Sequence, residues 1–122
     1  MANPNIVGVT SILGKTVGAA VTTSLTALVT NSSSSGEIYK INSLIVSNVD
    51  GTNAADITVE FYDNQTTGYK LASTITVPAD ATLVVISKET AIYLEENDSI
   101  RVLASATGDL QAVCSYEIIS SS

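Results

Sequence analysis

The sequence predicts an all-β protein, an antiparallel β-sandwich of jelly-roll-like form, and three observations support this. First, apolar and polar residues alternate over short runs, most clearly where Ile57, Val59 and Phe61 share one side of a segment. A period of two indicates a strand with one buried face. Second, runs rich in Gly, Asn, Asp and Ser separate nearly all of these segments. Third, no stretch sustains the 3.6-residue period of a helix. The pattern predicts about eight to ten short strands.

The central part of the chain predicts three strands, at Ile38–Val49, Ile57–Tyr62 and Tyr69–Val77, with polar turns between them. In the first of these the alternation changes phase around Asn42 and Ser43, which predicts a β-bulge or a bend. Further strands are expected at Asn5–Leu13, Lys15–Val21, Ser24–Thr30, Thr82–Ser87, Ala91–Leu94, Ser99–Ser105 and Leu110–Ile118. For Lys15–Val21 a short helix is the alternative, and the flanking threonines favour the extended form.

Two of these segments have distinctive features. Gly14 and Lys15 are interpreted as a turn that separates the first two extended segments. The run Thr82–Ser87 is continuously apolar in its middle, which favours a strand that is buried on both faces.

The length of the chain fits one domain over residues 1–122, because a typical domain contains roughly 100–150 residues. A chain of this size buries about two-thirds of its unfolded surface and needs no disulfide or metal to support its core. Residues 1–13 are interpreted either as a first strand or as an N-terminal arm, and residues 120–122 as a frayed tail.

The charge balance opposes two classes of partner. Twelve acidic and five basic residues give a formal charge of −7. Nucleic acids and anionic membranes both need Lys and Arg, so neither is an expected partner. The start of the chain lacks a signal-peptide pattern, and no run approaches the ~18 apolar residues that span a bilayer. We therefore expect a soluble protein that is synthesised in the cytoplasm.

No combination of residues predicts catalysis. The chain has no histidine, which excludes the usual Ser–His and Cys–His pairs. Cys114 lies in an alternating apolar run and is predicted to be a buried free thiol. The acidic residues available for carboxylate chemistry are expected on outward faces or in turns, as solvated acids: Glu60, Asp63, Glu89, Glu95, Glu96 and Asp98. We expect no enzymatic activity and no cofactor.

The turn that begins at Asp50 is rich in oxygen ligands, so a calcium loop is a candidate there. Counting from Asp50, Thr52 and Ala54 hold the third and fifth places, and Ala55 holds the sixth, where an EF-hand loop has Gly. The motif fails. The pair Asp50–Gly51 is typical of an ordinary tight turn, and no metal site is predicted.

Tyrosines supply most of the aromatic residues, five of six, and Trp is absent. Tyr62 and Tyr69 flank one loop and are the candidate platform on which a sugar ring would stack. The alternative is that each is an ordinary strand-end tyrosine, with a packed ring and a solvated hydroxyl.

Four runs of the sequence carry a family resemblance: Ile41–Asn48, Ala55–Val59, Leu71–Ala79 and Ile92–Val102. Together they resemble small β-sandwich structural proteins from the virions of tailed bacteriophages, in particular marine and cyanobacterial phages. Such proteins often have Gly-Asp at the turn where this chain has Asn97-Asp98. Asn97 departs only mildly from that pattern, because Asn also tolerates the left-handed conformation. The resemblance covers about half of the chain.

The resemblance implies a capsid decoration (cement) protein that binds and stabilises the assembled phage head. The absence of a coiled-coil or collagen-like extension favours this role over the alternatives, which are a neck, tail or fibre component and a glycan-binding module of a fibre or baseplate. The implied partners are the major capsid protein and further copies of the chain, with a homotrimer favoured, on the capsid surface of the virion. Contact residues are expected in an arm over Ala2–Leu13, and an ordinary first strand is the alternative for that segment. The candidates are Asn5, Ile6, Val7, Val9 and Ile12.

Overall fold

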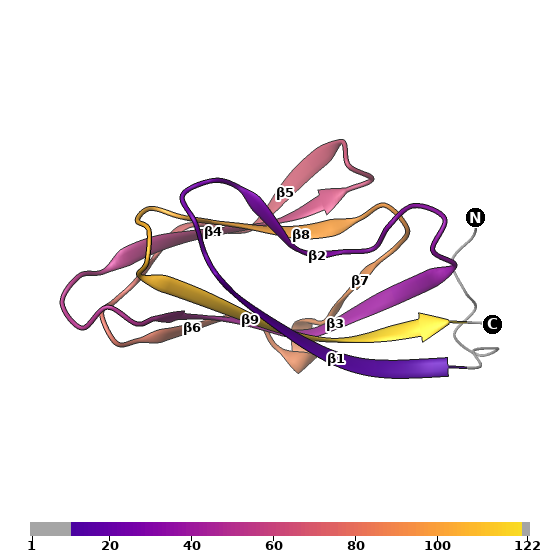
Figure 1. Ribbon diagram of the computed structural model, residues 1–122, viewed down its shortest axis with the longest axis horizontal. Coiled ribbons are helices and arrows are strands. Elements are labelled where there is room, and N and C mark those ends of the chain that lie inside the picture. The colour runs from indigo at the N-terminus through magenta and orange to yellow at the C-terminus, as the bar shows by residue number, and fades with distance from the viewer. Residues whose placement is uncertain (1–10, 121–122) are drawn as a thin grey trace.

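The computed structural model describes residues 11–120, which form two antiparallel β-sheets packed face to face (Figure 1). Sheet A has the strand order β1-β9-β3-β6, and β7 pairs with β3 beside β6; sheet B has the order β2-β8-β4-β5. The strands of sheet A are β1 (Ser11–Ala20), β3 (Glu37–Asn48), β6 (Thr82–Ile86), β7 (Ile92–Leu94) and β9 (Leu110–Ser120). Those of sheet B are β2 (Thr26–Thr30), β4 (Ala55–Asp63), β5 (Thr67–Val77) and β8 (Ser99–Ala104). A 3₁₀ turn at Lys88–Thr90 separates β6 from β7.

The strand pairing has the nested order of a jelly roll. β1 pairs with β9, β2 with β8, β3 with β6 and β7, and β4 with β5, all antiparallel. The chain is therefore arranged as one long hairpin whose tip is the β4–β5 turn, and this hairpin is folded over into two sheets. The predicted fold class, an all-β sandwich of jelly-roll form, is confirmed.

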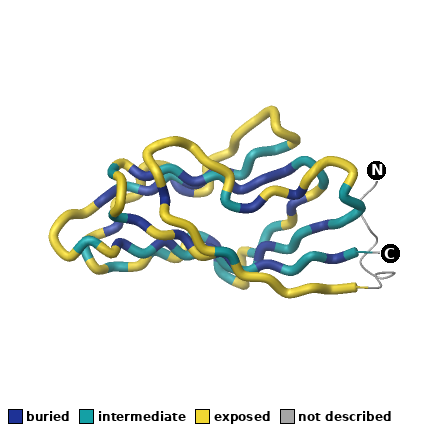
Figure 2. The backbone as a smooth tube through the Cα atoms, in the orientation of Figure 1, coloured by how far each residue is buried: buried dark blue, intermediate teal, exposed yellow. Residues whose placement is uncertain are grey.

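The core lies between the sheets and is built from the alternate residues of the central strands (Figure 2). Ile41 and Leu44 of β3, Ile57 of β4, Ile100 of β8 and Leu110 of β9 are fully buried. Each such side chain stabilises the fold by about 1.5–3 kcal/mol relative to an exposed one. The core thus follows directly from the period-two pattern of these strands.

Cys114 is part of this core. Its side chain is fully buried and forms no disulfide, as the sequence predicts. Burial raises the pKa of the thiol from 9.0 to about 12, so it stays protonated at neutral pH. The residue acts as a small apolar side chain.

The pairing of β9 with β3 and β1 tests two predictions about single sites in the sequence, a bulge and a turn. The bulge predicted at Asn42 and Ser43 is confirmed, because the β3–β9 register shifts between Ile41 and Ser43. The turn predicted at Gly14 and Lys15 is wrong, because β1 runs straight through both residues, which lie opposite two residues of β9. Pairing along the whole of β9 outweighs the weak turn preference of a single Gly.

The expectation that Thr82–Ser87 is buried on both faces is also wrong. β6 is an edge strand of sheet A, and Val84 in its middle is 57% exposed. A continuous apolar run is as compatible with an uncovered edge as with a central strand, because the run itself does not reveal what packs against it.

Candidate interaction surface

The outer face of sheet A, which turns away from sheet B, carries little charge. The register defines which side chains it holds: the hydroxyls of Thr16 and Ser115 are 3.0 Å apart on this side, and those of Ser47 and Thr82 are 3.2 Å apart. We call this surface the sheet A face. Its described residues are Ile12, Gly14, Thr16, Gly18, Ala20, Ile38, Lys40, Ser43, Ile45, Ser47, Thr82, Val84, Tyr93, Gln111, Val113, Ser115, Glu117 and Ile119.

Within that set, Lys40 and Glu117 are the charged residues, and they lie directly opposite each other in the β3–β9 register. The remainder is apolar or carries hydroxyl and amide groups. Neutral surface of this kind is inexpensive to desolvate, because a buried charge costs far more than a buried hydroxyl that finds a partner. The sheet A face is therefore suited to contact with another protein.

Two apolar rows cross the sheet A face in register: an isoleucine row of Ile12, Ile119 and Ile38, and a valine row of Val113, Ile45 and Val84. In the valine row, Val113 is 38% and Val84 57% exposed, and in the isoleucine row Ile12 is 58% exposed. Exposed apolar groups gathered on one face mark interaction sites more often than single exposed residues do.

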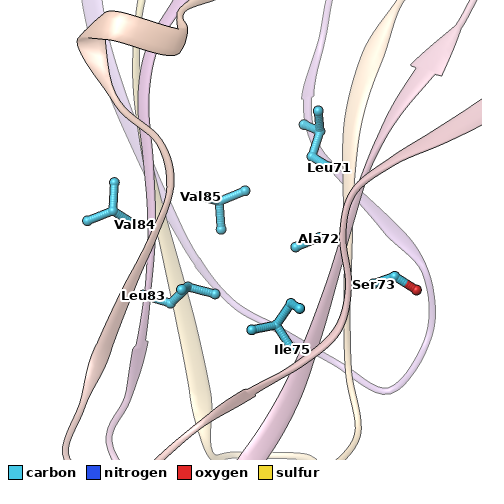
Figure 3. Close-up of a pocket in the computed structure, with 7 residues that line it drawn as sticks. All are labelled: Leu71, Ala72, Ser73, Ile75, Leu83, Val84 and Val85. Carbon is cyan, nitrogen blue, oxygen red and sulfur yellow. The ribbon is translucent and has the colours of Figure 1, made fainter.

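The sandwich is also open along one edge, where β5 of sheet B lies opposite β6 and β7 of sheet A. Tyr69 and Ile75 of β5 pair with the core-facing residues Phe61 and Ile57 of β4, yet they are 56% and 42% exposed. Sheet A ends at β6 and β7 and leaves them uncovered. An apolar groove of about 390 Å³ results, and it is lined by Leu71, Ala72, Ser73, Ile75, Leu83, Val84 and Val85 (Figure 3).

The side chains of β6 divide between these two surfaces. In Figure 3, Leu83 and Val85 lie on the side of β6 that faces β5, whereas Val84 lies on the other side. Val84 is opposite Ile45 and belongs to the valine row. The groove and the sheet A face therefore meet along β6 and form one continuous apolar region.

The groove continues into an aromatic part of about 190 Å³, lined by Phe61, Tyr69, Leu71, Ile92 and Tyr93. The rings of Phe61 and Tyr69 stack with their centroids 6.5 Å apart and their planes inclined by 22°. Neither part is lined by an acid, an amine or a thiol. The groove can bury apolar groups or stack against a ring, but its lining supplies no nucleophile or acid–base pair.

The outer face of sheet B differs, because it carries a compact ion cluster. Glu60 of β4 lies between Arg101 of β8 and Lys70 of β5; Lys70 Nζ is 2.6 Å from Glu60 Oε2, and Arg101 Nη2 contacts Oε1. The guanidinium group of Arg101 in turn lies 3.5 Å from the centre of the Tyr62 ring. Such a contact is a favourable cation–π interaction.

Glu60 is only 2% exposed, so the expectation that it is a solvated acid is wrong. Burial raises the pKa of its carboxyl, but the hydrogen bonds and positive charges of Lys70 and Arg101 outweigh burial and hold the pKa below its ordinary value. The carboxylate stays ionised and is neutralised by its neighbours. It has no proton to donate at neutral pH.

Asp98 is likewise buried, and the expectation of a solvated acid is wrong for it too. Its carboxylate accepts hydrogen bonds from the backbone N–H groups of Asn64 and Glu95, each at 2.9 Å. Burial raises the pKa of Asp98 above its ordinary value despite these two donors. The residue joins the β4–β5 turn to the β7–β8 turn. Beside it, Asn97 has a φ of 75°, the left-handed conformation that Asn tolerates.

Asp50 forms the predicted turn. Its Oδ1 accepts hydrogen bonds from the backbone N–H groups of Thr52 at 2.8 Å and Asn53 at 3.2 Å. These bonds lower the pKa of the Asp50 carboxyl. The carboxylate therefore organises its own loop.

The structure does not bring Tyr62 and Tyr69 together. Tyr69 pairs with Phe61, the residue that precedes Tyr62, so the two tyrosines project from opposite faces of sheet B. Tyr62 packs against Arg101, and Tyr69 lines the groove with Phe61. An aromatic surface exists at Tyr69, but its members are Phe61 and Tyr93.

Of the expected contact residues, Ile12 lies in the isoleucine row at the start of β1. Asn5, Ile6, Val7 and Val9 lie outside the described residues. Sequence reasoning missed the valine row and the groove, because alternation marks two faces without showing which of them is covered. A usable signal was the lack of charge in Thr82–Ile86, since edge strands commonly carry a protective charge.

Comparisons with known proteins agree with the fold. No protein-family model and no curated protein sequence matches the chain. A solved structure from Bacillus endospore appendages, described as a family of disulfide-linked pili, has a TM-score of 0.54 and 18% identity and covers 100% of this chain and 96% of that chain. A pentameric capsid protein from metagenomic phage sequences has a TM-score of 0.43 and 15% identity, covering 87% and 62% of the two chains. At these identities the first likeness shows a shared fold alone.

A third solved structure, the CBM22-1–GH10 modules of Clostridium thermocellum xylanase 10B, has a TM-score of 0.30 and 18% identity and covers 86% of this chain and 26% of that chain. Within residues 11–120, no helix is long and apolar enough to cross a membrane.

Proposed function

We propose that this protein is a non-enzymatic structural subunit of a larger assembly, and specifically a capsid decoration protein that binds and stabilises the assembled head of a tailed bacteriophage. The observation that carries the proposal is the continuous apolar region formed by the sheet A face and the groove. A monomer gains nothing from leaving this region in water, whereas an assembly subunit buries it.

Burial of the apolar region supplies the binding energy in this proposal. Each Å² of apolar surface removed from water contributes roughly 25 cal/mol, before the cost of association is subtracted. The hydroxyls of residues such as Thr16, Ser43 and Ser115 exchange water for hydrogen bonds to the partner. A protein that binds the assembled form and not the free capsid subunits stabilises the shell by mass action.

The partners proposed are the major capsid protein and further copies of this chain. The family resemblance favours a homotrimer. The contact residues proposed are Ile12, on the sheet A face, and Asn5, Ile6, Val7 and Val9, in the segment that precedes β1. The outer face of sheet B carries the ion cluster of Glu60, Lys70 and Arg101, whose charges are costly to desolvate, and this face stays in solvent in the proposal.

Binding to shells tests this proposal. Purified protein would be mixed with assembled phage heads that lack it, and separately with unassembled capsid protein, and the bound fraction measured after sedimentation. Val84→Lys places a charge in the apolar region, whereas Val49→Lys changes a similarly exposed valine, 51% exposed, in the β3–β4 loop. We expect Val84→Lys to reduce occupancy and Val49→Lys to leave it unchanged. Equal occupancy for both variants, or equal binding to unassembled subunits, would contradict the proposal.

The aromatic part of the groove favours a second candidate, a glycan-binding module of a fibre or baseplate. Phe61, Tyr69 and Tyr93 present ring surface beside an apolar wall, which is the arrangement that stacks on a sugar. A glycan array would test this candidate. Binding that is lost in Tyr69→Ala and retained in Tyr62→Ala would support it, and no binding to any glycan would remove it.

A further inference from the structure

The sheet edges of the sandwich differ in how well they are protected against pairing with another chain. Edge strands are commonly kept apart by being short, by β-bulges or by charged side chains. β2 has five residues and a register shift between Ala27 and Val29. β6 and β7 share one edge and have five and three residues. β5 is longer, but its pairing with β4 shifts register twice, and it contains Lys70. Each of these edges therefore carries at least one protective feature.

The outer edge of β1 is neither short nor bulged. β1 has ten residues, contains no proline, and pairs with β9 without a shift from Ser11 to Ala20. All of its residues are exposed except the half-buried Val17, and it forms the margin of sheet A (Figure 1). Every second N–H and C=O group of an edge strand points away from its own sheet. Among residues 11–120, no strand pairs with this edge, so β1 offers a long, regular template for a further strand.

The charge of the chain is not concentrated at this edge. Although the formal charge is −7, β1 and the adjacent β9 hold one charged residue each, Lys15 and Glu117. Lys15 lies opposite Tyr116, on the side of sheet A that faces sheet B, whereas Glu117 belongs to the sheet A face. Repulsion between two copies at this edge would therefore come mainly from Lys15.

The position of Lys15 selects one register for two copies of β1. Residues that lie opposite each other in an antiparallel pair share a face of the sheet, so a two-fold axis pairs one residue with its own copy. The two longest registers are centred on Lys15, over residues 11–19, or on Thr16, over residues 12–20. The first places two lysines directly opposite each other, which is destabilising. The second places Lys15 opposite Val17 and Gly14 opposite Gly18, and it brings two threonines together at the axis.

We propose that two copies of this protein pair through β1, antiparallel about a two-fold axis at Thr16, and join their A sheets into one continuous sheet. The pair brings Ile12, which is 58% exposed, beside Ala20 of the second copy, and Leu13, which is 57% exposed, beside Ala19 of the second copy. The occupant is a second copy because β1 matches itself in length and in charge in this register.

This contact goes beyond the proposed function, because it uses the backbone edge of β1 and involves neither the groove nor a phage head. A two-fold contact cannot close a homotrimer. The contact that holds the proposed homotrimer would have to lie on another surface, and the two kinds of association differ in mass.

Sedimentation equilibrium over a range of protein concentrations tests the pair, and we expect a monomer–dimer equilibrium. Thr16→Lys places two lysines opposite each other at the axis, and Thr67→Lys is the matched control at an exposed position of the edge strand β5. We expect Thr16→Lys to raise the Kd of the dimer about fivefold and Thr67→Lys to leave it unchanged. A parent protein that is monomeric at every concentration, a trimer as the smallest associated species, or an equal Kd for the two variants would overturn the inference.

Engineered disulfides test the register. Thr16→Cys places two thiols on opposite residues, whose Cα atoms are about 4.5–5.5 Å apart in antiparallel strands, within the range that a disulfide spans. Gly14→Cys and Gly18→Cys each place their own two thiols at least about 13 Å apart, whereas a mixture of the two variants brings unlike thiols opposite each other. The native Cys114 gives little background, because it is fully buried and the pKa of its thiol is raised to about 12.

After brief oxidation, non-reducing electrophoresis should show covalent dimers for Thr16→Cys and for the mixture, and few for Gly14→Cys or Gly18→Cys alone. Equal cross-linking of all four samples would indicate random collision and would overturn the inference. Efficient cross-linking of Gly14→Cys alone would overturn the register, and with it the axis at Thr16. Circular dichroism spectra that match the parent protein would show that the variants are folded.

Discussion

Gly68 gives a sharp test of the ion cluster on sheet B. This residue lies in β5 beside Glu60, and a Cβ atom at its position would lie 2.5 Å from Oε1, 2.8 Å from Cδ and 2.9 Å from Oε2 of Glu60. Those distances are too short for non-bonded atoms. Gly68→Ala must therefore displace a carboxylate that two cations hold in a buried site.

The magnitude follows from what the displaced carboxylate loses. One hydrogen bond to a charged group contributes about 1.5–3 kcal/mol. Replacing Gly by Ala in a strand otherwise gains roughly 0.5–1 kcal/mol from reduced backbone entropy. We therefore expect Gly68→Ala to lower the free energy of unfolding by about 1–2 kcal/mol.

Denaturant unfolding measured by fluorescence or circular dichroism would test this value, with Gly14→Ala as the matched control. No atom lies within 4 Å of a Cβ at Gly14, so that substitution should be neutral or slightly stabilising. In a Glu60→Ala background, Gly68→Ala should lose its cost, which gives a coupling energy of at least about 1 kcal/mol. Equal effects of Gly68→Ala and Gly14→Ala, or a coupling energy of zero, would show that the Glu60 carboxylate does not hold its place against the added methyl group.

Three further substitutions have defined outcomes. Cys114→Ser buries a hydroxyl among apolar atoms and should lower the free energy of unfolding, measured in urea, by about 1–3 kcal/mol. A loss of less than about 0.5 kcal/mol would contradict the burial of this side chain. Asn48→Ala removes the amide that donates to the Val77 carbonyl at 2.9 Å and to a second carbonyl, and should cost about 2–3 kcal/mol in urea unfolding. Glu60→Gln should be less stable than the parent protein at neutral pH. Because the pKa of Glu60 is lowered on folding, that difference should be complete above pH 4.5 and shrink as the pH falls through the folded pKa; a difference that is independent of pH would contradict the assignment.

The fold could be predicted because its cause is local in the sequence. Ile57, Val59 and Phe61 point to one side of a strand wherever that strand lies, and turns such as the one at Asp50 follow from side chains that bond to the nearby backbone. The bulge at Asn42 was visible as a change of phase. Nested pairing of the strands then gives the jelly roll.

The interaction surface could not be predicted in the same way, because exposure depends on what lies opposite a residue. Val84 and Ile86 are both apolar residues of β6, yet one is 57% and the other 2% exposed. A register shift in the β3–β6 pairing between Leu44 and Ile45 places them on opposite faces of this edge strand. Gly14 has the local composition of a turn, but it lies within β1 because that strand pairs with β9 along its whole length. These are properties of long-range register.

The burial of the charged residue Glu60 could not be predicted from the sequence either. Its place on the outer face of β4 follows from alternation, but its burial follows from Arg101 and Lys70, which are 41 and 10 residues away in sequence. Tyr62 and Tyr69 are close in sequence, and the pleat still puts them on opposite faces. Two residues that are close in sequence can therefore flank one loop and still lie on different faces of a sheet.

The copy number of this chain in purified virions tests the central claim most directly. Quantitative mass spectrometry against the major capsid protein would give it, with isotope-labelled peptides of both chains as standards. A decoration protein should be present in hundreds of copies per particle, in a fixed ratio to the capsid protein. A dozen copies or fewer would contradict the account and place the chain in the neck, tail or fibres.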